Sequence, residues 1–131
     1  MLKPTALDHV GLKVTDLDRT LDFYRLLGLE VLRTSGPSAD GLRSAVLRVG
    51  TQELNVFARP DFARDDRDET VGMDHFALNM DAASIAAVVA GLRHAGLEIT
   101  RGPVKRRDGS SVFVQDPDGV RVELRVARTS A

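Results

Sequence analysis

The feature that most constrains this sequence is a repeat: three short segments of its first half recur, in the same order, in its second half. The paired segments are 8–9 with 74–75, 28–31 with 96–99, and 53–56 with 123–126. Their offsets of 66, 68 and 70 residues grow slowly, as short loop insertions would make them grow. An ordered series of this kind indicates two copies of one structural module. Because 131 residues make one ordinary domain, we predict a single domain, residues 1–131, built from modules 7–57 and 74–126.

Each module begins with alternating apolar and polar residues, the pattern of a half-buried strand. A helix should follow, capped by Thr15 or Asp16 in the first module and starting at Ser84 in the second, and glycines then end both helices. Three more strands should complete each module, including one at 97–100 and a hairpin whose turn is Asp-Pro-Asp-Gly at 116–119. The charged segment 58–72 reads as a linker, and the end after residue 126 as frayed.

Eight strands and two helices give the α+β class. Each helix can cover only the apolar side of its own sheet. We therefore predict two βαβββ modules that form a cupped eight-stranded mixed sheet, with the helices on the outside. The opposite side of the sheet would then line a polar hollow.

The amino-acid composition limits the chemistry and the kinds of partner that are open to this chain. There is no cysteine, which excludes disulfides, thiolate metal sites and a cysteine nucleophile. A formal net charge of -1 argues against nucleic acid as a partner, and no apolar run is long enough to span a membrane. The N-terminal residues lack the pattern of a signal or transit peptide, so we expect a cytoplasmic protein that binds a small molecule.

Two histidines and two glutamates lie on the strand faces turned away from the helices: His9, His75, Glu53 and Glu123. Neutral imidazoles with one or two carboxylates suit zinc, nickel, cobalt, iron(II) or manganese. Taken alone, each of these residues has a simpler explanation than metal binding. A histidine can be a surface residue, and a carboxylate can pair with a neighbouring arginine. The recurrence of the same two residue types at the same place in both modules favours a divalent metal site. His94 reads as a surface residue at a helix end. The basic segment 104–111 could meet an anionic substrate, but a solvated hairpin tip is the preferred interpretation.

Segments 7–31, 73–80 and 112–124 resemble the vicinal oxygen chelate superfamily, which includes glyoxalase I, extradiol dioxygenases and bleomycin-resistance proteins. The most specific part is the Asp-Pro-Asp-Gly turn, with a glutamate four residues after its glycine. The resemblance implies paired βαβββ modules around a metal, with His9, His75 and Glu123 as ligands. It also implies a homodimer, with the site in one chain or shared between two. For the fourth ligand, the repeat favours Glu53 and an alignment of the strand favours Asn55. Alternation cannot separate them, because both lie on one face; Glu53 is slightly preferred.

The resemblance implies a glyoxalase-like lyase or isomerase. A metal would bind two adjacent substrate oxygens and stabilise an enediolate, while Glu123 or Glu53 moves the proton. A second possibility is a ring-cleaving dioxygenase with non-heme iron(II), which also uses two histidines and one carboxylate. A third is a drug-sequestering protein of the bleomycin-resistance type, which needs no metal. The substrate, any thiol cofactor and the identity of the metal stay open.

Overall fold

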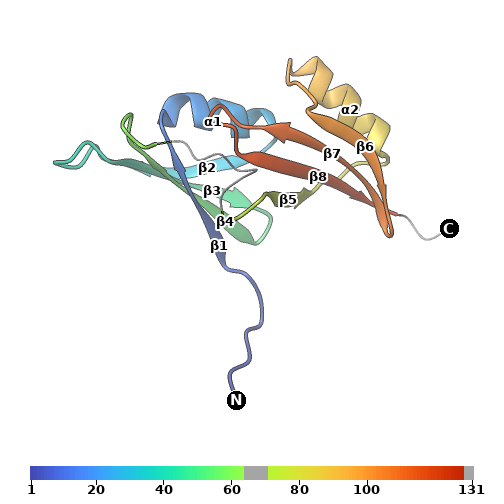
Figure 1. Ribbon diagram of the computed structural model, residues 1–131, viewed down its shortest axis with the longest axis horizontal. Coiled ribbons are helices and arrows are strands. Elements are labelled where there is room, and N and C mark those ends of the chain that lie inside the picture. The colour runs from blue at the N-terminus through green and yellow to red at the C-terminus, as the bar shows by residue number, and fades with distance from the viewer. Residues whose placement is uncertain (64–70, 129–131) are drawn as a thin grey trace. The chain divides into compact units, whose positions relative to one another are not determined.

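The structure of the chain is a computed structural model that describes residues 1–63 and 71–128 (Figure 1). The chain divides into two compact units, Met1–Arg64 and Asp65–Ala131. Each unit has the element order βαβββ, so the predicted α+β class and its two modules are confirmed. The predicted linker falls partly on 64–70 and the predicted frayed end partly on 129–131, which lie outside the described residues.

Five elements make up each unit, in the same order. The first unit contains β1 (His9–Val14), α1 (Leu17–Leu26), β2 (Glu30–Ser35), β3 (Arg43–Val49) and β4 (Gln52–Ala58). The second unit contains β5 (Phe76–Asn79), α2 (Ile85–His94), β6 (Arg101–Arg106), β7 (Gly109–Gln115) and β8 (Arg121–Ala127).

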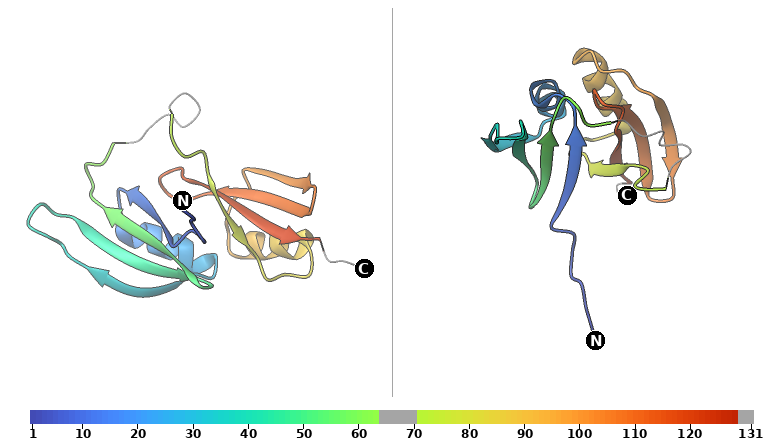
Figure 2. Two further views of the ribbon diagram at one scale, coloured as in Figure 1. Left: turned by 90° about the horizontal axis from the view of Figure 1, so that it is seen from below. Right: turned by 60° about the vertical axis from the view of Figure 1, so that its left-hand side comes forward.

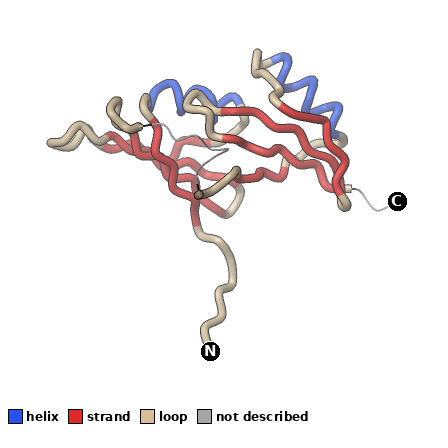
Figure 3. The backbone as a smooth tube through the Cα atoms, viewed as in Figure 1, coloured by secondary structure: helices blue, strands red, loops and turns tan. Residues whose placement is uncertain are grey.

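The eight strands form two four-stranded mixed sheets with the same topology, β1-β4-β3-β2 and β5-β8-β7-β6. In each sheet the first strand pairs in parallel with the last strand of its unit, and the other pairs are antiparallel. A parallel pair needs a crossover connection, which the helix and the two middle strands provide. Within each unit the helix lies over one face of its own sheet (Figures 2 and 3).

Both helices begin and end where the sequence predicts. The carboxylate of Asp16 accepts a hydrogen bond from the Arg19 amide at 3.2 Å, and the Ser84 hydroxyl accepts one from the Ala87 amide at 3.2 Å. These caps satisfy amides that the first helical turn leaves unpaired. Gly96 ends α2 with a φ of 74°, a conformation that favours glycine.

The apolar side chains between helix and sheet form a separate core in each unit. In the first unit, α1 packs against β3 and β4, and Tyr24 of the helix and Leu47 and Val56 of these strands are fully buried. In the second unit the corresponding strand residues are Val112 and Leu124, which are equally buried. Since these residues occupy the helix-facing side of each strand, residues at alternate positions point to the other side.

The predicted strand at 97–100 is wrong: β6 starts only at Arg101. The Leu97 amide donates to the carbonyl of Leu92 at 2.9 Å, so this part of the chain is used to end α2. Only Thr100 joins the sheet edge, where its amide donates to the carbonyl of Phe113 at 2.8 Å. Helix termination therefore outweighs the strand propensity of this short segment.

The turn between β7 and β8 places β8 and its glutamate. The buried carboxylate of Asp116 accepts hydrogen bonds from the amides of Asp118 and Val120, both at 2.9 Å. The amide of Gly119 donates to the Asp116 carbonyl, and Gly119 has a φ of 83°. A single side chain thus organises the turn that the sequence predicts.

Replacing Asp116 with alanine should lower the free energy of unfolding by about 2–3 kcal/mol, because two buried amides lose a charged acceptor. Chemical denaturation measures this change. Asp116→Asn keeps one side-chain oxygen as an acceptor. Its loss in free energy of unfolding should therefore be less than half of the loss in the alanine variant. Equal stability of the alanine variant and the wild type would contradict this role of Asp116.

Candidate active site

Glu123 is the central residue of a polar network in the second unit. It lies on β8 between the buried Val122 and Leu124, and it points to the sheet face away from α2. The residue is only 5% exposed. A buried carboxylate is costly unless charged or hydrogen-bonding partners surround it.

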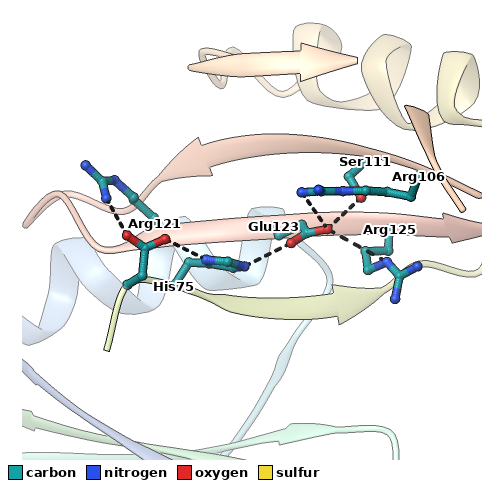
Figure 4. A network of polar contacts seen from close by, with 7 residues as sticks. His75, Arg106, Ser111, Arg121, Glu123 and Arg125 are labelled. Carbon is teal, nitrogen blue, oxygen red and sulfur yellow. Dashed lines mark hydrogen bonds and ion pairs between the residues drawn. The ribbon is translucent and has the colours of Figure 1, made fainter. Parts of the chain in front are cut away.

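Glu123 has four such partners (Figure 4). The Ser111 hydroxyl on β7 donates to Oε2 at 2.6 Å. Oε1 lies 3.0 Å from Nε2 of His75. Two guanidinium groups complete the set, with Arg106 Nη2 3.6 Å and Arg125 Nε 3.8 Å from Oε2.

These partners determine the charge of the carboxyl. Burial by itself would raise the pKa of Glu123, but the hydrogen bond from Ser111 and the positive charge of Arg106 act in the opposite direction, as does His75. The result is a pKa below the usual value for glutamate. Glu123 is therefore anionic at neutral pH, as a metal ligand or a proton acceptor must be.

His75 lies between two carboxylates. Its Nδ1 is 2.8 Å from Oδ2 of Asp74, and its Nε2 faces Glu123. Arg121 on β8 donates to the other oxygen of Asp74 at 2.9 Å (Figure 4). The hydrogen bond with His75, assisted by the charge of Arg121, holds the pKa of Asp74 below its usual value.

This arrangement fits a metal ion on chemical grounds. A neutral imidazole that donates from Nδ1 to Asp74 presents a lone pair at Nε2, toward another acceptor 3.0 Å away. Two facing acceptors need a proton or a cation between them. A carboxylate that orients an imidazole through its other nitrogen is also the common outer partner of metal-binding histidines.

A cavity of about 590 Å³ opens beside His75. The ring of Phe113 forms part of its wall and contacts the His75 ring edge to face, with 5.6 Å between ring centroids. Two guanidinium groups lie over the same ring, Arg101 at 5.2 Å and Arg106 at 5.8 Å from its centroid. Arg121 also lines the cavity, so the charged groups of the cavity wall are predominantly positive.

The first unit carries the other predicted residues. His9 has a half-exposed side chain, and its Nδ1 lies 2.8 Å from Oδ2 of Asp8, as His75 lies beside Asp74. In the parallel pairing of β1 with β4, His9 is opposite Glu53, and Gly11 is opposite Asn55. The predicted pair His9 and Glu53 is therefore adjacent on neighbouring strands.

The structure thus brings the predicted ligands together as two pairs, His75 with Glu123 and His9 with Glu53. Among residues 1–63 and 71–128, no three histidine, aspartate or glutamate side chains form a group that could hold a metal ion by itself. The use of all four residues as ligands of one ion stays a prediction.

Sequence reasoning missed the residues that support Glu123 and His75, namely Ser111, Arg106, Arg121 and Asp74. Ser111 and Arg106 lie in segment 104–111, which reads as a solvated hairpin tip, and this reading does not hold for Ser111 because it is fully buried. The signal for Asp74 was present in the repeat, since an aspartate precedes the histidine in both modules.

Replacing Ser111 with alanine should destabilise the protein by about 1.5–3 kcal/mol, because a buried carboxylate loses a hydrogen bond. Thermal and urea denaturation measure the change. Ser110→Ala is the matched control, since Ser110 alternates to the other face of β7 and should lie within about 0.5 kcal/mol of the wild type. Equal losses in both variants would contradict the role of Ser111.

Comparison with known proteins shows the family of this chain. The family model of the Glyoxalase/Bleomycin resistance protein/Dioxygenase superfamily matches residues 6–124, nearly the whole chain. The chain belongs to this superfamily. Among its relatives, the lactoylglutathione lyase of Escherichia coli O157:H7 is 35% identical over 121 residues, covering 88% of each protein. That of Salmonella typhimurium is 34% identical over 125 residues, covering 92% of this chain and 91% of the relative.

Solved structures of the superfamily share the fold. The glyoxalase family protein from Enterococcus faecalis is 30% identical, with a TM-score of 0.78 over 92% of this chain and 96% of that one. A mutant of the fosfomycin resistance protein FosX from Listeria monocytogenes, solved with Mn(II) and 1S,2S-dihydroxypropylphosphonic acid, has a TM-score of 0.72. It is 19% identical, covering 94% of this chain and 93% of FosX, and so shows the fold alone. No helix in the described part of this superfamily member could cross a membrane.

Proposed function

We propose that this superfamily member is a metal-dependent lyase or isomerase of the glyoxalase type, acting on a small substrate with two adjacent oxygens. The observation that carries the proposal is the alignment of Asp74, His75 and Glu123, in which Nε2 of His75 and Oε1 of Glu123 approach to 3.0 Å. The lactoylglutathione lyases among the relatives support the reaction class.

In the second unit the proposed metal ligands are His75 and Glu123, and in the first unit the proposed metal ligand on β1 is His9. A fourth donor would come from β4, where Glu53 and Asn55 are the candidates. When bound, a divalent ion supplies Lewis acidity toward the two substrate oxygens. Zinc, nickel, cobalt, iron(II) and manganese all suit a set of imidazole and carboxylate ligands.

The side chains around that site have distinct tasks in the proposal. Glu123 accepts the proton from the substrate carbon next to the carbonyl and returns it to the neighbouring carbon, which completes an isomerisation without an oxidant. Asp74 holds the proton of His75 on Nδ1 and so keeps Nε2 available as a ligand. The guanidinium groups of Arg101 and Arg106 bind anionic parts of the substrate, such as the carboxylates of a glutathione adduct.

The direct test is reconstitution. Protein treated with a chelator and dialysed receives each of the five metals in turn, and is assayed with the adduct of glutathione and methylglyoxal for formation of lactoylglutathione. We expect activity to return with at least one metal and to disappear again with chelator. Absence of turnover with all five metals would refute the lyase proposal.

One observation favours a second candidate, the iron(II)-dependent ring-cleaving dioxygenase. His9, His75 and Glu123 together are two histidines and one carboxylate, the set that non-heme iron oxygenases use. Oxygen consumption by iron-loaded protein with a catechol, and none with the glutathione adduct, would establish this alternative.

We also propose that the protein is a homodimer, since two-fold dimers are the commonest assemblies. Sedimentation equilibrium would then give a mass of twice 14.2 kDa.

Arg101 offers a prediction about substrate binding. Among the described residues it has no carboxylate partner, and it lies over Phe113 in the cavity. Arg101→Ala should raise KM for an anionic substrate about tenfold and change kcat by less than about twofold. Arg107→Ala is the control, because Arg107 lies outside this cavity on the same hairpin. Unchanged KM in Arg101→Ala would contradict an anion-binding role.

A further inference from the structure

We infer that Asn55, and not Glu53, is the metal ligand that β4 supplies. The inference rests on the proposed metal site and specifies its fourth ligand. Alternation along β4 cannot decide between the two residues, because both lie on the same face. Strand register can decide, because the two units repeat the same parallel pairing.

The register makes Asn55 the counterpart of Glu123. In the second unit, Phe76 pairs with Val122 and Ala77 with Glu123. Glu123 is therefore opposite the second residue after His75. In the first unit, the second residue after His9 is Gly11, and its partner is Asn55.

Glu53 has a different counterpart. It is opposite His9 itself. Continued by one residue, the pairing of β5 with β8 places Arg121 opposite His75, so Glu53 corresponds to Arg121 and not to the proposed ligand. Glu53 also lies opposite Arg48 of β3, whose guanidinium group forms an ion pair with Glu30 of β2.

The neighbours across the strand support the same equivalence. Gly11 faces Asn55 and Ala77 faces Glu123, and these are the two smallest side chains available. A small residue opposite a donor leaves room beside it. At Gly11, an added Cβ would meet only one atom within 4 Å, on the Phe57 ring at 3.8 Å.

The side chain of Asn55 also has an oxygen atom that is available to coordinate a cation. Its Oδ1 is buried and has no hydrogen-bond partner among the described residues. A buried acceptor without a partner costs about 1–3 kcal/mol, and natural structures seldom leave one without a reason. The carboxylate of Glu123, at the corresponding place, is held by Ser111 and two arginines. Coordination of a cation would satisfy the Asn55 oxygen.

An asparagine ligand in place of a glutamate changes the charge around the ion. The neutral amide of Asn55 cancels none of the charge of a doubly charged ion, whereas the carboxylate of Glu53 would cancel one unit of it. Such a site binds the cation more weakly and an anionic substrate more strongly.

Metal affinity tests this assignment without an activity assay. Isothermal titration with Mn²⁺, Co²⁺ and Ni²⁺ is compared for the wild type, Asn55→Ala, Asn55→Asp and Glu53→Gln. We expect Asn55→Ala to lose about tenfold or more in affinity, and Glu53→Gln to stay within about twofold of the wild type. Asn55→Asp restores an oxygen donor with a charge and should bind at least as tightly as the wild type. The visible spectrum of bound Co²⁺ should change in the Asn55 variants only.

The outcomes separate the two proposals. Loss of affinity in Glu53→Gln with an unchanged Asn55→Ala would overturn the assignment of Asn55 and leave the metal site in place. Unchanged affinity in both variants, while His75→Ala abolishes binding, would also overturn it. If the wild type binds none of the three metals, the metal site and its fourth ligand fall together. Circular dichroism of each variant shows whether a loss of affinity reflects unfolding.

Discussion

Replacing Glu123 with glutamine should lower kcat of the metal-reconstituted enzyme by roughly 10³-fold, the range observed when a positioned acid or base is removed. Glutamine keeps the shape and can still accept from Ser111, but it cannot take a proton from carbon. The position of Glu123, with Oε1 3.0 Å from Nε2 of His75 and Oε2 held by Ser111, makes it the carboxylate best placed for this step. The measurement is steady-state turnover at saturating metal.

Glu53→Gln is the matched control, because it makes the same chemical change on β4. We expect it to retain kcat within about threefold of the wild type, since Glu53 lies outside the proposed proton transfer and substitutions away from such features have small effects. If Glu53→Gln removes activity and Glu123→Gln does not, the assignment of the proton-transferring residue is wrong.

The second large effect concerns metal binding. His75→Ala should reduce metal affinity by at least about 100-fold, because a direct ligand matters more than outer partners whose loss costs roughly 10–100-fold. The variant also leaves Asp74 and Glu123 without the imidazole between them. Metal content after dialysis, measured by plasma emission, reports the loss directly.

His94→Ala is the control for this variant. His94 is the last residue of α2, away from the Glu123 network, and the sequence reads it as a surface residue. It should leave metal content unchanged. Equal metal content in His75→Ala and in the wild type would contradict the proposed site.

The architecture was predictable from sequence because its causes are local or periodic. The repeat predicts two modules, and alternation assigns Glu123 and His75 to the side opposite the helices. Residue type predicts the cap of the first helix as Thr15 or Asp16 and the start of the second helix as Ser84, and the structure has caps at Asp16 and Ser84. The strand predicted at 97–100 was wrong because helix termination uses the same backbone groups.

The support of the site was less predictable, because it depends on which strands are neighbours. Ser111 reaches Glu123 across a strand pair, 12 residues away in sequence, and its neighbours in sequence suggest an exposed turn. Likewise, Glu53 and Asn55 lie on the same face of β4 and differ in the residue of β1 that each one pairs with. The two-residue period of a strand cannot show that difference. Long-range pairing carries this information, and one sequence read along its length does not contain it in a readable form.

The central claim is that one divalent ion is held jointly by His75 and Glu123. A crystal structure of metal-loaded protein, with anomalous data collected at the absorption edge of the metal, tests it most directly. The account predicts a single strong peak about 2.0–2.3 Å from both Nε2 of His75 and a carboxylate oxygen of Glu123. A fully loaded crystal with no peak there, and with His75 still hydrogen-bonded to Glu123, would contradict it.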